Sequence, residues 1–219
     1  LEQYDNNAPK TMNAHLHVLE AYTLLYQCWK DNGLKKRLEF CVDLFMNRIY
    51  DPSRKHFNLF FDNEWNSLVE MDSYGHDVET GWLLCEAART LENQDLIEQT
   101  NQLALDVTEA CLAEGMSDKG YMIYEKKGDR KTKHASWWGQ IETVIACVNA
   151  WQISGSDVYL QSVDTVWTFV KDHMVDKEYG EWYSDCFDGE PKKEAPKVSM
   201  WRCPYHTVRL GVEMYNRLK

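Results

Sequence analysis

The chain has 219 residues, of which 44% are hydrophobic and 13% aromatic, and its formal net charge is −11. The charge excludes nucleic acid as an expected partner, because phosphate binding needs clustered Lys and Arg. No apolar run is long enough to cross a membrane, and the seven cysteines lack the spacing of a disulfide framework. With no shift in composition along its length, the sequence predicts a single cytoplasmic domain over residues 1–219 with free thiols.

Hydrophobic periodicity predicts seven helices in chain order. They are expected over residues 11–31, 34–50, 73–91, 95–113, 136–153, 157–175 and 204–218. Short β excursions are expected between the helix pairs, at 56–69, at 120–129 with a turn at Gly128-Asp129, and at 180–196 with a turn at Asp188-Gly189. In the last excursion, Glu181–Tyr183 is predicted to be a strand. Gly33 is expected to stop the first helix.

Four helix starts repeat one pattern at intervals of roughly 60 residues, which is typical of repeated helix pairs. The four units are His17-Val-Leu-Glu20, His76-Asp-Val-Glu79, Gly139-Gln-Ile-Glu142 and His206-Thr-Val-Arg209. Positions i and i+3 of a helix share a face, so each unit directs two polar side chains to one side. This alternation predicts an α/α barrel whose inner helices begin around a common pocket, with a linear solenoid as the alternative.

His76 and His206 are the predicted acid–base pair, because imidazole titrates near neutrality and a helix start favours its neutral form. A single histidine is more often structural, but three at matching repeat positions favour chemistry. His15 is expected to point elsewhere on its helix. His56, His134 and His173 are predicted to lie at the surface. A His and a Glu at i, i+3 resemble half of a di-metal site, yet the order is reversed and the units lie on different helices, so no metal is predicted.

Aromatic residues are expected at the same end of the molecule as the histidines. Trp137 and Trp138 open one helix and Trp201 precedes another. Together with Asn13 and the carboxylates they favour a carbohydrate pocket, since flat aromatic faces stack on sugar rings. A simple packing wedge is the alternative for the Trp pair.

Five segments carry a resemblance to a known family. They are Lys10-Thr-Met-Asn-Ala-His-Leu-His-Val-Leu-Glu-Ala-Tyr-Thr23, Ser73-Tyr-Gly-His-Asp-Val-Glu79, Trp137-Trp-Gly-Gln-Ile-Glu142, Gly180-Glu-Trp-Tyr183 and Trp201-Arg-Cys-Pro-Tyr-His206. In order and spacing they resemble the N-acylglucosamine 2-epimerase family, and the last segment is most similar to its cellobiose 2-epimerase branch. The resemblance implies an all-α fold of the (α/α)6-barrel type. Because family members are nearly twice as long, the chain corresponds to the C-terminal part, about seven helices, and lacks the N-terminal helices.

The resemblance also implies a reaction and residue roles. The family inverts C2 of a reducing-end sugar, here in β-1,4-linked disaccharides such as cellobiose, through a cis-enediolate. In this reading His76 and His206 exchange the proton and Glu79 assists ring opening. The substrate-binding residues are then Asn13, His17, Trp137, Trp138, Glu142 and Trp201. A small-molecule sugar is the expected partner, no cofactor is implied, and the full-length members are expected to be monomers.

Three other functions remain open at this point. An aldose–ketose isomerase of the same family uses the same enediolate but returns the proton to a different carbon. An inverting glycosidase on a helical barrel needs two opposed carboxylates, whereas the matched positions here are mainly histidines. A half-length chain also fits an inactive fragment or a sugar-binding module.

Overall fold

The structure is a computed structural model that describes residues 8–219, so the first seven residues of the predicted domain lie outside the described range. Its α-helices are α2 (Met12–Cys28), α3 (Asn32–Leu44), α4 (Tyr74–Leu91), α5 (Gln94–Gly115), α6 (Trp137–Ser154), α7 (Val158–Phe169) and α8 (Tyr205–Arg217). The seven predicted helices are confirmed, with ends that shift by a few residues. No described helix is both long and apolar enough to cross a membrane.

Local sequence explains where the helices begin. The side chains of Thr11, Asp31 and Ser136 accept hydrogen bonds from backbone N–H groups in the first turns of α2, α3 and α6. Each cap satisfies a donor that has no partner inside the helix. Gly33 was predicted to end the first helix, but α2 already ends at Cys28 and Gly33 lies in the first turn of α3. The Asp31 cap starts α3 earlier than the position of the glycine suggested.

Two outer helices end in a wider π-helical turn. Segment η1 (Phe45–Ile49) follows α3 and segment η2 (Val170–Met174) follows α7. The predicted helical lengths to residues 50 and 175 are therefore nearly correct, although the last turn of each is not α-helical. The recurrence of this turn in two helix pairs supports the internal repeat.

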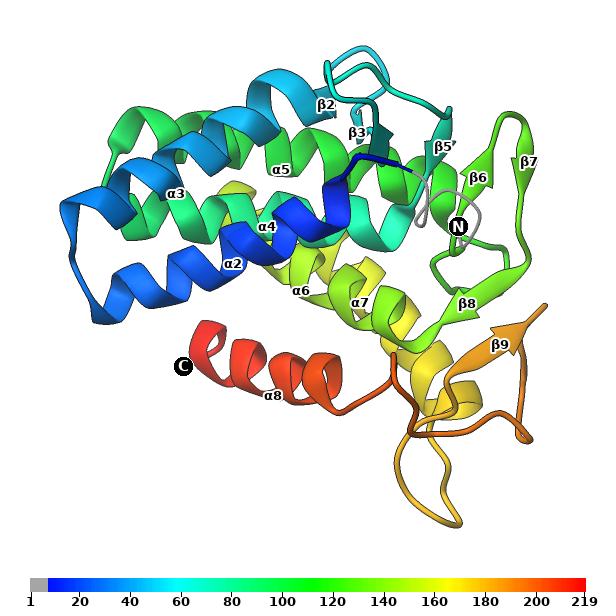
Figure 1. The fold of residues 1–219 in the computed structure, drawn as a ribbon. Coiled ribbons are helices and arrows are strands. Elements are labelled where there is room, and N and C mark those ends of the chain that lie inside the picture. Colours follow the sequence, from blue (N-terminus) through cyan, green and yellow to red (C-terminus); the bar gives the residue numbers. More distant parts are fainter. Residues whose placement is uncertain (1–7) are drawn as a thin grey trace.

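The helices form two layers. Helices α2, α4, α6 and α8 pack against one another in that order, while α3, α5 and α7 cover their outer side. Most residues of α4 and α6 are buried, and these include polar side chains such as Asp77, Glu79 and Glu142. In α8 only Arg209 and Leu210 are buried. The inner helices thus form an arc with α2 and α8 at its two ends (Figure 1).

Short antiparallel strands gather at the end of the molecule where the inner helices begin (Figure 1). The paired strands are β1 (Lys10–Thr11) with β4 (Phe60–Phe61), β2 (Tyr50–Asp51) with β3 (His56–Phe57), β5 (Met71–Asp72) with β6 (Lys126–Lys127), β6 with β7 (Arg130–Lys131), and β8 (His134–Ser136) with β9 (Asp185–Phe187), which also pairs with β10 (Glu190–Pro191). Because β1, β5 and β8 lead directly into α2, α4 and α6, the strands fix the starts of these helices.

One strand prediction is confirmed and one needs correction. The excursion at 56–69 has two short strands as predicted, β3 and β4, which pair with β2 and β1, and the chain then turns back so that Ser67 forms an isolated bridge with Phe61. The strand predicted at Glu181–Tyr183 begins instead at Asp185, because Glu181 has a φ of 62° and Trp182 makes only an isolated bridge to Val175. The turns at Gly128-Asp129 and Asp188-Gly189 are confirmed.

The cysteines are all free, as predicted. Cys28 and Cys203 are exposed, and the other five are buried. Buried thiols of this kind act as small apolar groups in the core.

Candidate active site

The last residue of each repeated unit reaches one buried centre. Glu20, Glu79, Glu142 and Arg209 come from α2, α4, α6 and α8. The Nη1 of Arg209 donates to Oε1 of Glu79 at 2.6 Å and to Oε1 of Glu142 at 3.0 Å, and its Nη2 donates to Glu20. Each inner helix therefore directs its i+3 position toward the same point, as the spacing predicted.

His206 is bound to this centre through Glu142. Its Nδ1 lies 2.7 Å from Oε1 of Glu142, while the indole of Trp82 donates to the other carboxylate oxygen at 2.9 Å. Burial lowers the pKa of His206, but the hydrogen bond and charge of Glu142 and the charge of Glu79 outweigh it, so the pKa is raised above its ordinary value. The protonated form of His206 is therefore favoured relative to that of an ordinary histidine.

His76 has the opposite environment. Its Nδ1 lies 2.8 Å from the hydroxyl of Ser73, so its other ring nitrogen is left for chemistry. Burial, followed by the positive charges of His17 and His206, lowers the pKa of His76 to about 3. The rings of His76 and His206 lie 4.6 and 5.6 Å from that of Trp138. Two imidazoles whose pKa values are shifted in opposite directions therefore share contact with a single indole.

Glu79 is the carboxylate best placed to hold a proton near neutrality. Three carboxylates surround the single guanidinium of Arg209, which leaves the group with excess negative charge. Burial and the charge of Glu142 raise the pKa of Glu79 to about 7, against the opposing effect of Arg209. Glu79, Glu142 and His206 also have the mutual spacing of metal ligands, but the Arg209 guanidinium already bridges the two carboxylates.

His17 joins the centre from its more exposed side. Its Nδ1 lies 3.2 Å from Oε2 of Glu20, and its ring makes an edge contact with Tyr205 at 6.2 Å. The Tyr205 hydroxyl donates to the same carboxylate. The hydrogen bond to Glu20 is the main cause that raises the pKa of His17. Three of the four inner helices therefore present an imidazole at this end.

A cavity of about 830 Å³ opens between α2, α4, α6 and α8. Glu20, Trp82, Tyr205 and Arg209 line it, and it continues toward the C-terminal ends of the inner helices, where Arg217 pairs with Glu86 at 2.9 Å. Among the residues that line it are none of the three histidines. The buried charged centre thus separates the histidine side of the arc from this cavity.

Comparison with known proteins decides the family. The model of the N-acylglucosamine 2-epimerase (GlcNAc 2-epimerase) family matches residues 1–209. The chain belongs to the N-acylglucosamine 2-epimerase family. The cellobiose 2-epimerase of Bacteroides fragilis is 41% identical over 98% of this chain and 55% of its own length, and that of Dictyoglomus turgidum is 35% identical over 100% and 56%.

A solved structure of the family supports the fold. The cellobiose 2-epimerase from Bacillus thermoamylovorans B4167 superposes with a TM-score of 0.92 at 36% identity, covering 96% of this chain and 54% of that one. The chain spans about half the length of the curated relatives it matches and corresponds to their C-terminal half. The predicted (α/α)6-barrel class, represented here by its C-terminal part, is confirmed.

The structure brings together most of the site residues expected from the family resemblance. Around the Arg209 centre lie His17, His76, Glu79, Trp138, Glu142 and His206. The Trp137 ring meets that of His206 edge-on at 6.3 Å. Asn13 is exposed in the first turn of α2. Trp201, in the loop before α8, is 84% exposed and lies apart from the cluster.

The prediction that three histidines lie at the surface is wrong for one and inexact for two. His56 is 1% exposed and bonds Asp77, because β3 folds it beneath the start of α4. His134 is half-buried, with its Nε2 at 2.5 Å from Asp185, and His173 is half-buried against Phe169. Short strands and the π-helical turn cover both rings.

Three residues that bond to one another in or beside this centre were not among the predicted site residues, namely Glu20, Tyr205 and Arg209. Glu20 and Arg209 had a sequence signal, since each occupies the i+3 position of a repeated unit. The arginine in place of the recurring glutamate marks the position that forms ion pairs with the other three. Tyr205 had no comparable signal beyond its place next to His206.

Proposed function

We propose that the chain supplies the proton-transfer groups of a sugar 2-epimerase acting on the reducing end of β-1,4-linked disaccharides such as cellobiose. The observation that carries the proposal is the contact of His76 and His206 with one indole while their pKa values move in opposite directions. A base and an acid available at the same pH are what removal and return of a proton require. The names of the similar proteins favour cellobiose as the disaccharide.

The proposed reaction begins with the open-chain sugar. Glu79, whose pKa is raised to about 7, exchanges the proton that opens and closes the ring. Neutral His76 then removes the proton from C2, next to the aldehyde, and a cis-enediolate forms. Positioned donors must stabilise its negative charge, and protonated His206 is the nearest cation that can also give up a proton.

Inversion follows from a change of face. Rotation about the C2–C3 bond presents the opposite face of C2, and His206 donates its proton there. His76 then holds the proton taken from the substrate and His206 is neutral, so exchange with solvent restores the starting protonation. In the reverse reaction the two histidines exchange roles. Trp138, in contact with both rings, is placed to support the sugar by stacking.

The test is isotope incorporation. The chain is incubated with cellobiose in deuterated water, and the products are separated and analysed by NMR. We expect a disaccharide ending in mannose with deuterium at C2, and no product with the His76→Asn variant, while the His173→Asn variant behaves as the parent. Absence of both epimer and exchange from the chain and from a protein containing the complete family fold would refute the proposal.

The products also separate the alternatives. An aldose–ketose isomerase returns the proton to C1 and yields a ketose with deuterium at that carbon. An inactive fragment or sugar-binding module gives neither product from the 219-residue chain, and a sugar-binding module still binds cellobiose in calorimetry.

A further inference from the structure

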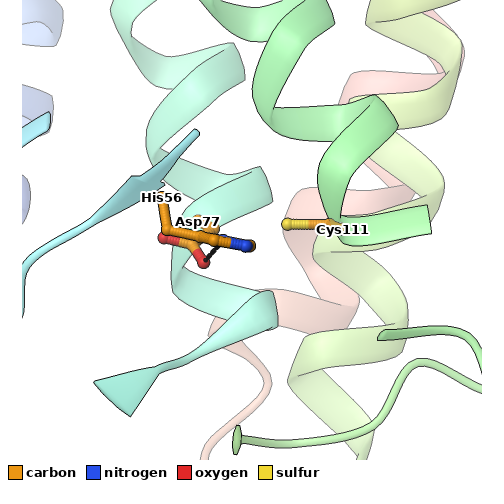
Figure 2. Close-up of side chains that lie close together, drawn as sticks. All are labelled: His56, Asp77 and Cys111. Atoms are coloured by element: carbon orange, nitrogen blue, oxygen red, sulfur yellow. Dashed lines mark hydrogen bonds and ion pairs between the residues drawn. The ribbon is translucent and has the colours of Figure 1, made fainter. Parts of the chain in front are cut away.

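His56 occupies a second buried cluster, below the start of α4. Its Nδ1 lies 2.8 Å from Oδ2 of Asp77 (Figure 2). The other oxygen of Asp77 accepts the backbone N–H of Phe57 at 2.9 Å. Asp77 is completely buried and both its oxygens are engaged. A carboxylate that holds Nδ1 in this way fixes the ring and directs Nε2 elsewhere, the usual arrangement behind a metal-binding histidine.

Two buried polar atoms face the cluster without a hydrogen-bond partner among the described residues. They are Nε2 of His56 and the hydroxyl of Tyr74, whose rings lie 5.8 Å apart. A buried polar atom without a partner costs free energy, so a pair of them indicates a missing ligand or water. Nε2 lies 3.7 Å from Oε1 of Glu114, too far for a hydrogen bond.

The atoms around this point form a polar pocket. His56, Asp72 and Glu114 each offer a ligand atom within 4.8 Å of the other two. They line a cavity of about 280 Å³ together with Ser53, Arg54, Glu70, Lys126 and Gly128. This is room for a small ion with a few waters, and it is separate from the centre around Arg209.

Two cationic side chains contact the carboxylates of this pocket. Arg54 bonds Oδ1 of Asp72 at 2.5 Å, and the Nζ of Lys126 lies 3.0 Å from Glu114 and 3.7 Å from Asp72. The Lys126 ammonium thus occupies a position between two carboxylates. Its side chain is 27% exposed and extends from a short strand, so it can turn toward solvent. A cation of higher charge would then replace the Lys126 ammonium between the carboxylates.

We propose that His56, Asp72 and Glu114 bind a divalent transition-metal ion of the zinc class, with Asp77 orienting His56 and Lys126 filling the position when the ion is absent. One imidazole nitrogen with carboxylate oxygens suits zinc, whereas magnesium and calcium prefer oxygen ligands alone. Cys111 also lies beside His56 (Figure 2). Its thiol donates to the backbone oxygen of Tyr74 at 3.9 Å, so it is not counted as a ligand.

Such an ion would connect three elements. His56 belongs to β3, Asp72 to β5 and Glu114 to the last turn of α5. Asp72 comes just before α4, which carries His76 in its first turn. The ion would therefore stiffen the start of that helix, and we expect it to raise the melting temperature of the protein.

The test is zinc binding to the 219-residue chain, measured by calorimetry and by elemental analysis after dialysis, with magnesium as the comparison ion. We expect one zinc ion per chain, no comparable binding of magnesium, and a melting temperature that rises with zinc by mass action. Glu114→Gln and Asp77→Asn should each weaken zinc binding by about 10- to 100-fold. Glu98→Gln, an exposed change on the same helix, should bind as the parent does.

Lys126→Gln separates this proposal from a purely structural cluster. Because the substitution removes the competing ammonium, the variant should bind zinc more tightly than the parent. If Lys126 is only a structural ion-pair partner, the substitution should not increase the affinity for zinc. Absence of saturable zinc binding, equal binding by the Glu114→Gln and Glu98→Gln variants, or weaker binding by Lys126→Gln would each overturn the proposal. The Glu114 and Lys126 side chains are partly exposed, so these variants are expected to fold.

Discussion

Two histidine–carboxylate pairs in the described part of the chain have nearly the same geometry and different surroundings. The Nδ1 of His206 lies 2.7 Å from Glu142, and that of His56 lies 2.8 Å from Asp77. Around His206 the carboxylates share the guanidinium of Arg209, whereas Nε2 of His56 has no hydrogen-bond partner among the described residues and lies 3.7 Å from Glu114. The pair alone therefore does not define a function. The function depends on which groups face the second ring nitrogen.

The first pair faces the indole of Trp138. The second faces two more carboxylates in a small pocket. An indole surface suits an organic substrate and a group of oxygen ligands suits an ion. The same arrangement of imidazole and carboxylate is thus suited to proton transfer in one place and to ion binding in the other.

The largest expected effect is a loss of folding stability when the centre around Arg209 loses its guanidinium. Arg209→Ala leaves Glu20, Glu79 and Glu142 buried without their cation, and breaking a buried ion pair in this way costs about 3–5 kcal/mol of unfolding free energy. Urea denaturation measures it. The matched control is Arg89→Ala, which removes a half-exposed pair with Glu86 and should cost about 0–1 kcal/mol. Similar values for both variants would mean that the centre is not a buried network.

The next largest effect is on kcat, and it distinguishes the His206–Glu142 pair from the cluster around His56. Under the proposed epimerase function, replacing His206 with Asn should lower kcat by about 10²- to 10⁴-fold, because a positioned acid is lost. Glu114→Gln, in the second cluster, should leave kcat near the parent value. Both are measured by epimer formation from cellobiose. A fall of similar size in both variants would remove the functional distinction between the clusters.

The pH profile offers a further test of the first pair. His206 has a raised pKa, so its acid form persists above the ordinary histidine range and is lost as pH rises through the raised value. His76, with its pKa near 3, stays neutral throughout this range. The epimerisation rate should therefore fall on the alkaline side. Glu142→Gln removes the main cause of the raised pKa and should shift this fall to lower pH, which a pH series of kcat/KM would detect. An unchanged alkaline limb would contradict the assignment of His206 as the acid.

The first centre was accessible to sequence reasoning because its residues repeat. Glu20, Glu79, Glu142 and Arg209 occupy one register position on successive inner helices, and helical geometry brings such positions to a common side. The same regularity predicted the inner and outer helices, whereas the seven helices themselves were predicted from hydrophobic periodicity. It did not reveal that the charged groups bond one another, because a pairing between helices depends on how far apart they pack.

The second cluster had no such signal. His56 comes from a strand of two residues and Asp77 from a helix 21 positions later, so no period connects them. Their meeting depends on the pairing of β2 with β3, which a short irregular segment does not encode in its hydrophobic pattern. The expectation that His56 is exposed failed for this reason.

The smallest expected effect concerns Trp201, which contributes to neither buried cluster. Its side chain is 84% exposed, so Trp201→Ala should change the free energy of unfolding by no more than about 0.5 kcal/mol. If the role implied by the family resemblance is correct, the same variant raises KM for cellobiose in a protein containing the complete fold, where other helices can bring the loop before α8 to the sugar. Denaturation and kinetics on that variant therefore separate a substrate contact from a packing role. An unchanged KM would remove Trp201 from the site and leave Trp138 as its aromatic surface.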